Sequence, residues 1–156
     1  MFNEEVLRMK KKILCLLLLI SSCSNNQGSE EKAEIETNSG KLDYSITKQD
    51  QIKWVDVFNQ KEDRYMVYFY SEYCGYCRSI KEEILNYYLL QKDRFYFVDA
   101  IEEEAVFHAP ANGIIGCDNI EDFYIAGTPM LVEFTDWIVT NQYTGVENIR
   151  LYITKC

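Results

Sequence analysis

The sequence has few of the residues on which many catalytic sites depend. It contains one histidine, His108, and only two prolines among 156 residues. No Ser–His–Asp set stands out, and neither does a phosphate-binding glycine loop or a pair of glycosidase carboxylates. We therefore expect His108 to be an ordinary surface or core residue, and the chemistry of this chain to lie with other side chains.

Positive charge is also scarce. The chain has 16 Lys and Arg against 25 Asp and Glu, for a net charge of −9. Four basic and two acidic residues lie at or before Ser22, so the remainder carries 12 positive and 23 negative charges. An acidic body of this kind keeps a protein soluble, and it argues against nucleic acid as a partner and against electrostatic adhesion to anionic lipid.

The N-terminal apolar run is too short to cross a bilayer. Ile13–Ile20 has eight residues and follows the basic stretch Met9–Lys12, a pattern typical of a secretory signal peptide. Ile20-Ser21-Ser22-Cys23 then resembles the lipobox of bacterial lipoproteins. This resemblance implies that Cys23 is lipidated, with two or more acyl chains for stable anchoring. The alternative is an ordinary cleaved signal that happens to end at a cysteine.

These features predict three parts of the chain. We expect a lipoprotein signal peptide over 1–22, a flexible polar tether over 23–40 and one folded domain over 41–156. Two glutamates before the basic stretch are unusual for such a leader, so we expect Met9 to be the true start. The predicted location is outside the bacterial cell membrane and anchored to it, where disulfides persist.

Cys74-Gly75-Tyr76-Cys77 is the most informative motif. It lies between an apolar run typical of a buried strand, 66–70, and a predicted helix over 76–90. Two thiols at this spacing can bridge and open again, and the helix dipole favours a thiolate at Cys74. We expect Cys74 to attack and the more buried Cys77 to resolve. Gly75 permits close backbone approach, and Tyr76 offers an apolar surface and a hydroxyl.

Two other interpretations of the motif remain open. It is half of a zinc site if Cys117 with Cys156 or His108 completes four ligands, although the spacing matches no zinc pattern. It is otherwise an inert disulfide. For Cys117 and Cys156 we expect a structural disulfide that links an inserted segment to the C-terminus, with free thiols or a second redox station at Cys117 as alternatives. We expect no metal and no cofactor.

The first half of the domain is predicted to contain a βαβ unit. A second buried strand over 95–98 follows the helix, which implies parallel pairing through a right-handed crossover. Before this unit we expect a short edge strand over Leu42–Ile46 and a helix capped by Thr47. After it, Asp99–Gly116 is interpreted as an insertion or lid.

The second half is predicted to end in a hairpin and a helix. A helix capped by Asp118 or Asn119 is expected to run to Ile125. Strands over 130–134 and 137–143 follow, joined by a turn at Thr135-Asp136, and a short helix over 145–152 ends the chain.

This order of elements, with the Cys-Gly-Tyr-Cys motif and Gly127-Thr128-Pro129, resembles the thioredoxin superfamily. The motifs are most similar to the catalytic domains of disulfide isomerases of the Dsb type. The resemblance implies an α/β, thioredoxin-like fold, with a central mixed β-sheet flanked by helices and an insertion before the cis-Pro loop. It also implies that Pro129 is cis and packs beside the cysteines, and that the backbone at Thr128 pairs with an extended substrate.

The chain departs from this family pattern. Tyr68 stands where thioredoxins carry a buried aspartate, the dimerisation domain of the isomerases is missing, and the inserted segment is long. Tyr73 and Tyr76 are candidate substrate contacts, with ordinary surface or core rings as the alternative. Glu72 is a candidate proton carrier or a solubilising carboxylate, and Arg78 either favours the thiolate or faces water.

The function predicted from these observations is a membrane-anchored, extracytoplasmic thiol–disulfide oxidoreductase. It would be an oxidase, a reductase or an isomerase of exported proteins or peptides, and it would need a membrane or extracytoplasmic redox partner. The alternative is a non-catalytic, thioredoxin-like peptide-binding lipoprotein with a structural disulfide. Metal handling is a third hypothesis.

Overall fold

The computed structural model describes residues 42–91, 94–108 and 113–155. All described residues belong to one compact unit. The predicted signal peptide, the tether and Cys23 lie outside the described residues, and so does Cys156. None of the helices in the described part of the chain has the length and apolar character needed to cross a membrane.

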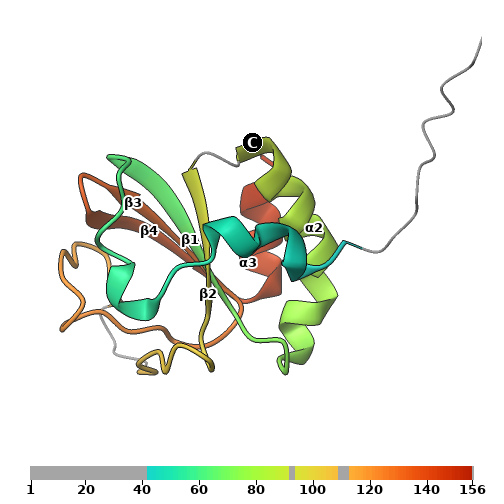
Figure 1. Ribbon diagram of the computed structural model, residues 1–156, viewed down its shortest axis with the longest axis horizontal. Coiled ribbons are helices and arrows are strands. Elements are labelled where there is room, and N and C mark those ends of the chain that lie inside the picture. Colours follow the sequence, from blue (N-terminus) through green and yellow to red (C-terminus); the bar gives the residue numbers. More distant parts are fainter. Residues whose placement is uncertain (1–41, 92–93, 109–112, 156) are drawn as a thin grey trace, which may run out of the picture. The chain divides into compact units, whose positions relative to one another are not determined.

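Four strands form one mixed sheet in the order β2-β1-β3-β4 (Figure 1). Their bounds are β1 Arg64–Tyr70, β2 Phe95–Asp99, β3 Met130–Thr135 and β4 Ile138–Thr144. β1 pairs with β2 in parallel and with β3 antiparallel, and β3 and β4 form an antiparallel hairpin. The predicted strands and the parallel βαβ unit are therefore confirmed.

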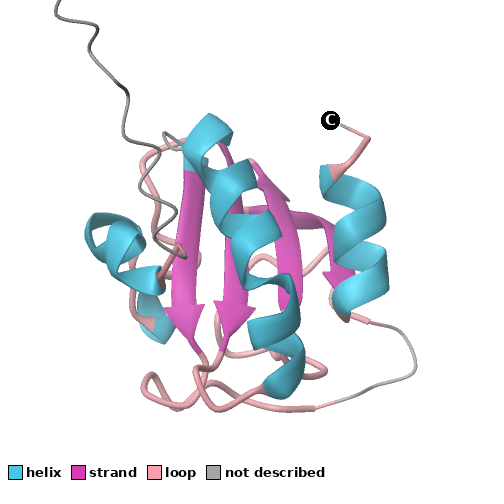
Figure 2. Cartoon of the chain, turned by 90° about the vertical axis from the view of Figure 1, so that its right-hand side faces the viewer, coloured by secondary structure: helices cyan, strands magenta, loops and turns pink. Residues whose placement is uncertain are grey.

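Helices α2 (Gly75–Gln91) and α3 (Val146–Ile153) cover one face of the sheet (Figure 2). Helix α2 contains no proline and no glycine after its first residue, and its buried residues Ile80, Ile84, Tyr87 and Tyr88 recur every three or four positions. That spacing places one apolar stripe on the sheet, as the sequence predicted. Both predicted helices are confirmed to within about one residue.

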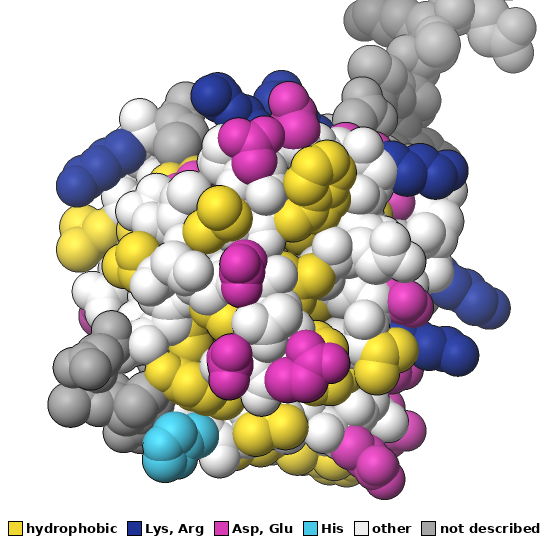
Figure 3. Space-filling view, turned by 90° about the vertical axis from the view of Figure 1, so that its left-hand side faces the viewer, with side chains coloured by type: hydrophobic (Ala, Val, Ile, Leu, Met, Phe, Trp, Pro, Cys, Tyr) yellow, Lys and Arg dark blue, Asp and Glu magenta, His cyan; other side chains and the backbone are white. Residues whose placement is uncertain are grey.

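The other face of the sheet is covered mainly by irregular chain. The described residues between β2 and β3 form turns, bends and one parallel bridge between Phe107 and Ile125. Phe123 packs edge-on or tilted against the rings of Trp54, Phe58 and Phe134 beneath this chain. Figure 3 shows hydrophobic side chains exposed between carboxylates on this side of the molecule.

The prediction of an edge strand over Leu42–Ile46 is wrong. A 3₁₀ helix, η1, occupies Tyr44–Asp50, and the side chain of Asp43 caps it by accepting a hydrogen bond from the Ser45 N–H at 3.1 Å. Tyr44 and Thr47 are buried. Residues three apart lie on one side of a 3₁₀ helix, so this spacing buries both. The predicted helix capped by Thr47 is also absent, because Thr47 lies within η1 and its hydroxyl donates to the Tyr44 backbone oxygen at 2.7 Å. A second 3₁₀ turn, η2, follows at Trp54–Asp56.

The predicted helix from Asp118 or Asn119 to Ile125 is also absent. Asn119 does form the local cap, because its Oδ1 accepts from the Asp122 N–H at 2.9 Å. The chain then extends instead of coiling, since Phe123 and Ile125 are both buried, at 1% and 0% exposed. Alternate burial fits extended chain, which places successive side chains on opposite sides.

The turn of the β3–β4 hairpin lies one residue later than predicted. Asp136 and Trp137 both have positive φ, 51° and 59°, as a type I′ turn requires. Tertiary contacts hold them there. The Asp136 N–H donates to the backbone oxygen of Asp63 at 2.7 Å, and the Trp137 indole N–H donates to the backbone oxygen of Gln60 at 2.9 Å. These contacts replace the glycine that such turns favour.

Candidate active site

The Cys74–Cys77 motif lies where β1 ends and α2 begins. The Cys74 N–H donates to the Ser71 oxygen at 3.1 Å, which closes the turn between strand and helix. Arg78 donates from Nη1 to the backbone oxygens of Glu72 and Tyr73, both at 3.2 Å. Arg78 therefore braces the loop that carries Cys74, a role that the sequence did not indicate.

The Cys74 sulfur lies among donors and acceptors of two separate segments. The Cys77 N–H donates to Cys74 Sγ at 3.4 Å, and the Cys74 thiol donates to the Thr128 oxygen at 3.3 Å. The Thr128–Pro129 peptide bond is cis, as the resemblance implied. Two motifs 54 residues apart in the sequence thus meet at one sulfur atom.

The pKa of Cys74 lies below the ordinary value of a cysteine thiol. Partial burial raises it, but hydrogen bonds with the Thr128 side chain, with the backbone and thiol of Cys77 and with the backbone of Tyr76 together outweigh burial. The backbone N–H donors belong to the first turn of α2, where unsatisfied N–H groups and the helix dipole favour negative charge. Cys74 is the thiol poised to react as a thiolate.

Cys77 has the opposite properties. Its side chain is fully buried, and burial is the main cause that raises its pKa to about 12. Contacts with the Ser71 backbone and the Thr128 side chain lower the pKa and offset only part of this effect. A buried, protonated thiol within one helical turn of an accessible one suits the resolving role predicted for it.

Two buried tyrosine hydroxyls lie in the core that contains Cys77. Tyr44 and Tyr68 are 3% and 0% exposed, and neither hydroxyl makes a hydrogen bond of ordinary geometry among the described residues, although the two phenols lie close enough to affect each other's pKa. Burial is the main cause that raises the pKa of each phenol, so both stay neutral. Tyr68 therefore cannot replace a buried aspartate as a base, because it offers a proton and does not accept one at neutral pH.

A groove adjoins the cysteines on the side of the cis peptide bond. It has a volume of about 490 Å³, and its lining includes Tyr76, Thr128, Pro129, Gly145 and Val146. Tyr76 is 72% exposed, so its ring faces solvent at the mouth of the site. The sequence indicated the first three residues, whereas the contribution of Gly145 and Val146 from the start of α3 depends on the tertiary fold.

Other candidate residues lie away from the sulfur atoms or make no bond with them. The side chain of Glu72 is exposed, and Tyr73, at 78% exposed, belongs to the outer rim. His108 is exposed and packs edge-on against Tyr124 at 5.3 Å between ring centroids. No three acidic, His or Cys side chains of the described residues are grouped to hold a metal ion.

Cys117 forms no disulfide with another described cysteine, and its Sγ donates to the Asn119 backbone oxygen at 3.2 Å. Burial is the main cause that raises its pKa, with the carboxylates of Asp122 and Asp118 adding to the effect. This thiol is therefore a poor nucleophile, which does not suit a second redox station. Because Cys156 lies outside the described residues, the Cys117–Cys156 disulfide stays a prediction.

Comparison with known proteins yields similarity of structure only. No protein-family model matches the chain, and no curated protein matches it. Mitochondrial thioredoxin 3 from Saccharomyces cerevisiae is similar in structure, with 16% identity over 72% of this chain and 98% of that one and a TM-score of 0.50. Thioredoxin f2 from Chlamydomonas reinhardtii has 19% identity over 67% and 90% of the two chains and a TM-score of 0.47. The first similarity shows that this chain has a thioredoxin-like fold.

Proposed function

We propose that this chain is a thiol–disulfide oxidoreductase that acts through Cys74 and Cys77. The observation that carries the proposal is the asymmetry of the two sulfur atoms. Cys74 is partly exposed at the start of α2, beside the cis peptide bond and with a lowered pKa, while Cys77 is fully buried with a raised one. One thiol is thus ready to attack and the other is held back, as a two-step exchange requires.

The first step forms a mixed disulfide. The Cys74 thiolate attacks one sulfur of a substrate disulfide, a bond forms between the two sulfur atoms, and the second substrate sulfur leaves as a thiolate. The N–H of Cys77, 3.4 Å from Cys74 Sγ, stabilises the attacking sulfur before this step. After the attack, the Cys74 sulfur carries no negative charge, and the hydrogen bonds that lowered its pKa lose part of their value.

The second step releases the substrate. Cys77 loses its proton, and its sulfur attacks Cys74 Sγ to form the intramolecular disulfide. The remaining substrate sulfur leaves with the electron pair of the broken bond. Two electrons and the Cys77 proton pass from the protein to the substrate, and the second substrate thiolate takes its proton from water. The reverse sequence oxidises a substrate dithiol. Since neither Tyr44 nor Tyr68 is a base at neutral pH, we assign the Cys77 proton to the departing substrate thiolate.

We propose that the substrate is an extended protein or peptide segment. Its reacting cysteine would lie over Cys74, its backbone would pair with the backbone at Thr128, and a neighbouring apolar side chain would occupy the groove. Support comes from the lining of that groove, where Tyr76, Pro129 and Val146 offer apolar surface. Extended backbone pairing supplies affinity, and the groove supplies the preference for an apolar neighbour.

We further propose that the enzyme acts outside the cell membrane on exported proteins, held there by lipid on Cys23. The lipobox-like sequence before Cys23 supports this proposal. Replacement of Cys23 by serine should release the protein from the membrane fraction, whereas Cys15→Ser, within the leader, should leave it bound. Membrane retention of the Cys23→Ser protein would refute the anchor and leave the redox proposal intact. A membrane or extracytoplasmic partner would restore the redox state of the dithiol.

The test of the redox proposal is trapping in cells. With Cys77→Ser, the mixed disulfide has no internal attacker, so covalent complexes with substrates should accumulate and disappear on reduction. Cys74→Ser is the matched control and should trap none. Absence of complexes with Cys77→Ser in cells that produce the folded protein would count against the enzyme.

The reduction potential separates the proposal from a peptide-binding protein with a permanent disulfide. Redox-active couples of this kind lie between about −270 and −120 mV, whereas structural disulfides lie below about −300 mV. Equilibration with glutathione or dithiothreitol measures the value. A value in the upper part of the first range would also assign an oxidase, and a value near its lower end a reductase.

A further inference from the structure

A second polar pocket lies at the opposite end of β1 from the cysteines. It has a volume of about 370 Å³ and is lined by the start of β1, the end of α2 and parts of β3 and β4. Arg64 is the first residue of β1, and the turn that carries Cys74 follows its last residue, Tyr70. A strand of this length spans roughly 20 Å, so the pocket is separate from the redox site.

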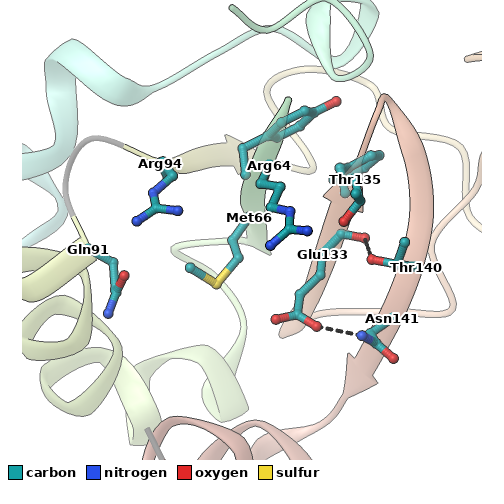
Figure 4. A pocket seen from close by; sticks show the side chains of 10 residues that line it. Arg64, Met66, Gln91, Arg94, Glu133, Thr135, Thr140 and Asn141 are labelled. Atoms are coloured by element: carbon teal, nitrogen blue, oxygen red, sulfur yellow. Dashed lines mark hydrogen bonds between the residues drawn. The ribbon is translucent and has the colours of Figure 1, made fainter. Parts of the chain in front are cut away.

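Two arginines face this pocket from neighbouring segments. Arg64 begins β1, and Arg94 immediately precedes β2, the parallel neighbour of β1. Figure 4 shows both guanidinium groups directed into the pocket on either side of Met66. Gln91, the last residue of α2, adds an amide beside Arg94.

Neither of these arginines has an ion-pair or hydrogen-bond partner among the described residues. The other two described arginines are fully engaged: Arg150 pairs with Glu83 at 2.8 Å and with Glu147 at 2.8 Å, and Arg78 donates to two backbone oxygens. The contrast is notable because acidic residues outnumber basic ones, 25 to 16, in the whole chain. In an acidic protein, two guanidinium groups at one pocket with no partner among the described residues are available to bind an anionic ligand.

Glu133, the carboxylate of the same pocket, is occupied by other donors. It lies opposite Met66 in the β1–β3 register and therefore diagonal to Arg64, yet no ion pair joins the two. Its Oε2 accepts from Asn141 Nδ2 at 2.7 Å and from the Tyr143 hydroxyl at 3.3 Å, and its Oε1 accepts from the Tyr152 hydroxyl. Figure 4 shows the bond to Asn141. Both oxygens of Glu133 thus accept hydrogen bonds from other donors, while the arginine N–H groups have no acceptor among the described residues.

We infer that this pocket binds an oxyanion of the phosphate class between Arg64 and Arg94. A guanidinium presents its N–H groups in a planar fork that matches two oxygens of a phosphate or a carboxylate. Two guanidinium groups carry two positive charges, which match the double charge of a phosphate monoester better than the single charge of a carboxylate. The Gln91 amide supplies a further donor at the same wall.

Titration with inorganic phosphate tests the site on the full chain. Backbone amide signals of residues 64–66, 94 and 133–141 should shift with a saturable dependence, with a dissociation constant on the order of 1 mM. Acetate, with one charge, should bind at least about tenfold more weakly. Glycerol 3-phosphate is the second arm: tighter binding than inorganic phosphate indicates a lipid headgroup as the source, and equal binding indicates free phosphate.

Three arginine variants and one control variant test whether Arg64 and Arg94 bind the phosphate. Arg64→Gln and Arg94→Gln should each weaken phosphate binding by about tenfold or more, and the double variant should abolish saturable binding. Lys48→Gln removes one positive charge at another surface and should leave binding unchanged. Both arginines are exposed and without partners, so the amide spectrum should show an intact fold, and the rate at which Cys74 reacts with a disulfide reagent should not change.

The proposal is overturned by either of two results. One is the absence of saturable shifts with both phosphate and glycerol 3-phosphate. The other is saturable binding that persists in the double variant, or that falls equally in Lys48→Gln, because the site would then lie elsewhere or the effect would be one of overall charge. Neither result bears on the redox proposal, which depends on the opposite end of β1.

Discussion

The sulfur of Cys74 lies 3.3 Å from the backbone oxygen of Thr128, on the segment that leads into β3. The contact places the reactive atom next to the backbone at which an extended substrate would pair. The sulfur that would attack and the backbone that would align the substrate are therefore in direct contact.

The two thiols should titrate at well-separated pH. The pKa of Cys74 is lowered from the ordinary value of 9.0, so its alkylation rate should rise with pH and level off below pH 9. Burial raises the pKa of Cys77 to about 12, so in Cys74→Ser the rate at Cys77 should still be rising at pH 10. Iodoacetamide kinetics with mass spectrometry measure both. Equal pH profiles would contradict the division of roles.

Removal of the Tyr68 hydroxyl should not destabilise the fold. No hydrogen bond of ordinary geometry reaches this buried hydroxyl, which has the Tyr44 phenol beside it, so Tyr68→Phe should be neutral or raise the free energy of unfolding by up to about 1 kcal/mol. Tyr65→Phe is the matched control, because that hydroxyl donates to the Val57 oxygen at 2.9 Å, and it should lower stability by about 1 kcal/mol. Urea unfolding gives both values. A loss at Tyr68 as large as at Tyr65 would show that its hydroxyl is bonded.

The irregular segment between β2 and β3 should be an integral part of the core. Ile125 is 0% exposed, so Ile125→Ala should cost about 2–5 kcal/mol of unfolding free energy through the cavity it leaves. Ile115, in the same segment but 63% exposed, should tolerate alanine within about 0.5 kcal/mol. Thermal or urea unfolding distinguishes the two. Similar small losses at both positions would mean that the segment is not packed as described.

The groove should control substrate affinity and not thiol reactivity. Val146→Asp introduces a carboxylate at the first residue of α3, where the helix dipole tolerates it. It should raise the KM for a peptide with an apolar residue beside its cysteine by about tenfold, because that side chain would meet a charge. The alkylation rate of Cys74 should not change. Asn148→Asp adds the same charge outside the groove lining and should leave KM unchanged. If both variants raised KM equally, the cause would be the net charge of the protein and not the groove.

The prediction from sequence was most reliable where one local pattern decided the structure. Met66–Tyr70 is a continuous apolar run, and α2 has a regular apolar stripe, so each favours one kind of element irrespective of its neighbours. The prediction failed at Leu42–Ile46 and at the segment that begins at Asn119. Only at Asn119 was the local signal correct in part, since Asn119 forms the predicted cap. The residue that caps η1 is Asp43, which had not been predicted as a cap. The contacts that those segments make with the core then determined their conformation.

In the candidate site, too, some features could be predicted from the sequence and others depend on the tertiary fold. The spacing of Cys74 and Cys77 at the start of a predicted helix was enough to indicate redox chemistry and to predict which thiol attacks. The sequence could not indicate that Arg78 braces the loop or that the first turn of α3 lines the groove, because these residues approach the cysteines only in the folded chain. Nor could it show that Arg64 and Arg94 have no partner among the described residues, since ion pairs depend on which side chains the sheet brings together.

By itself, then, the sequence determined the order of the four strands and the two α-helices, the thiol pair at a helix start and the acidic character of the body. These properties follow from residue type and from spacing along the chain, which determine local structure without long-range contacts. The tertiary structure alone decided how completely Cys77 is buried, how close the Thr128 oxygen lies to Cys74 and which charges of the described residues remain unpaired. Burial, hydrogen bonding and ion pairing depend on distances between residues far apart in the sequence, and only the packing of the sheet sets those distances.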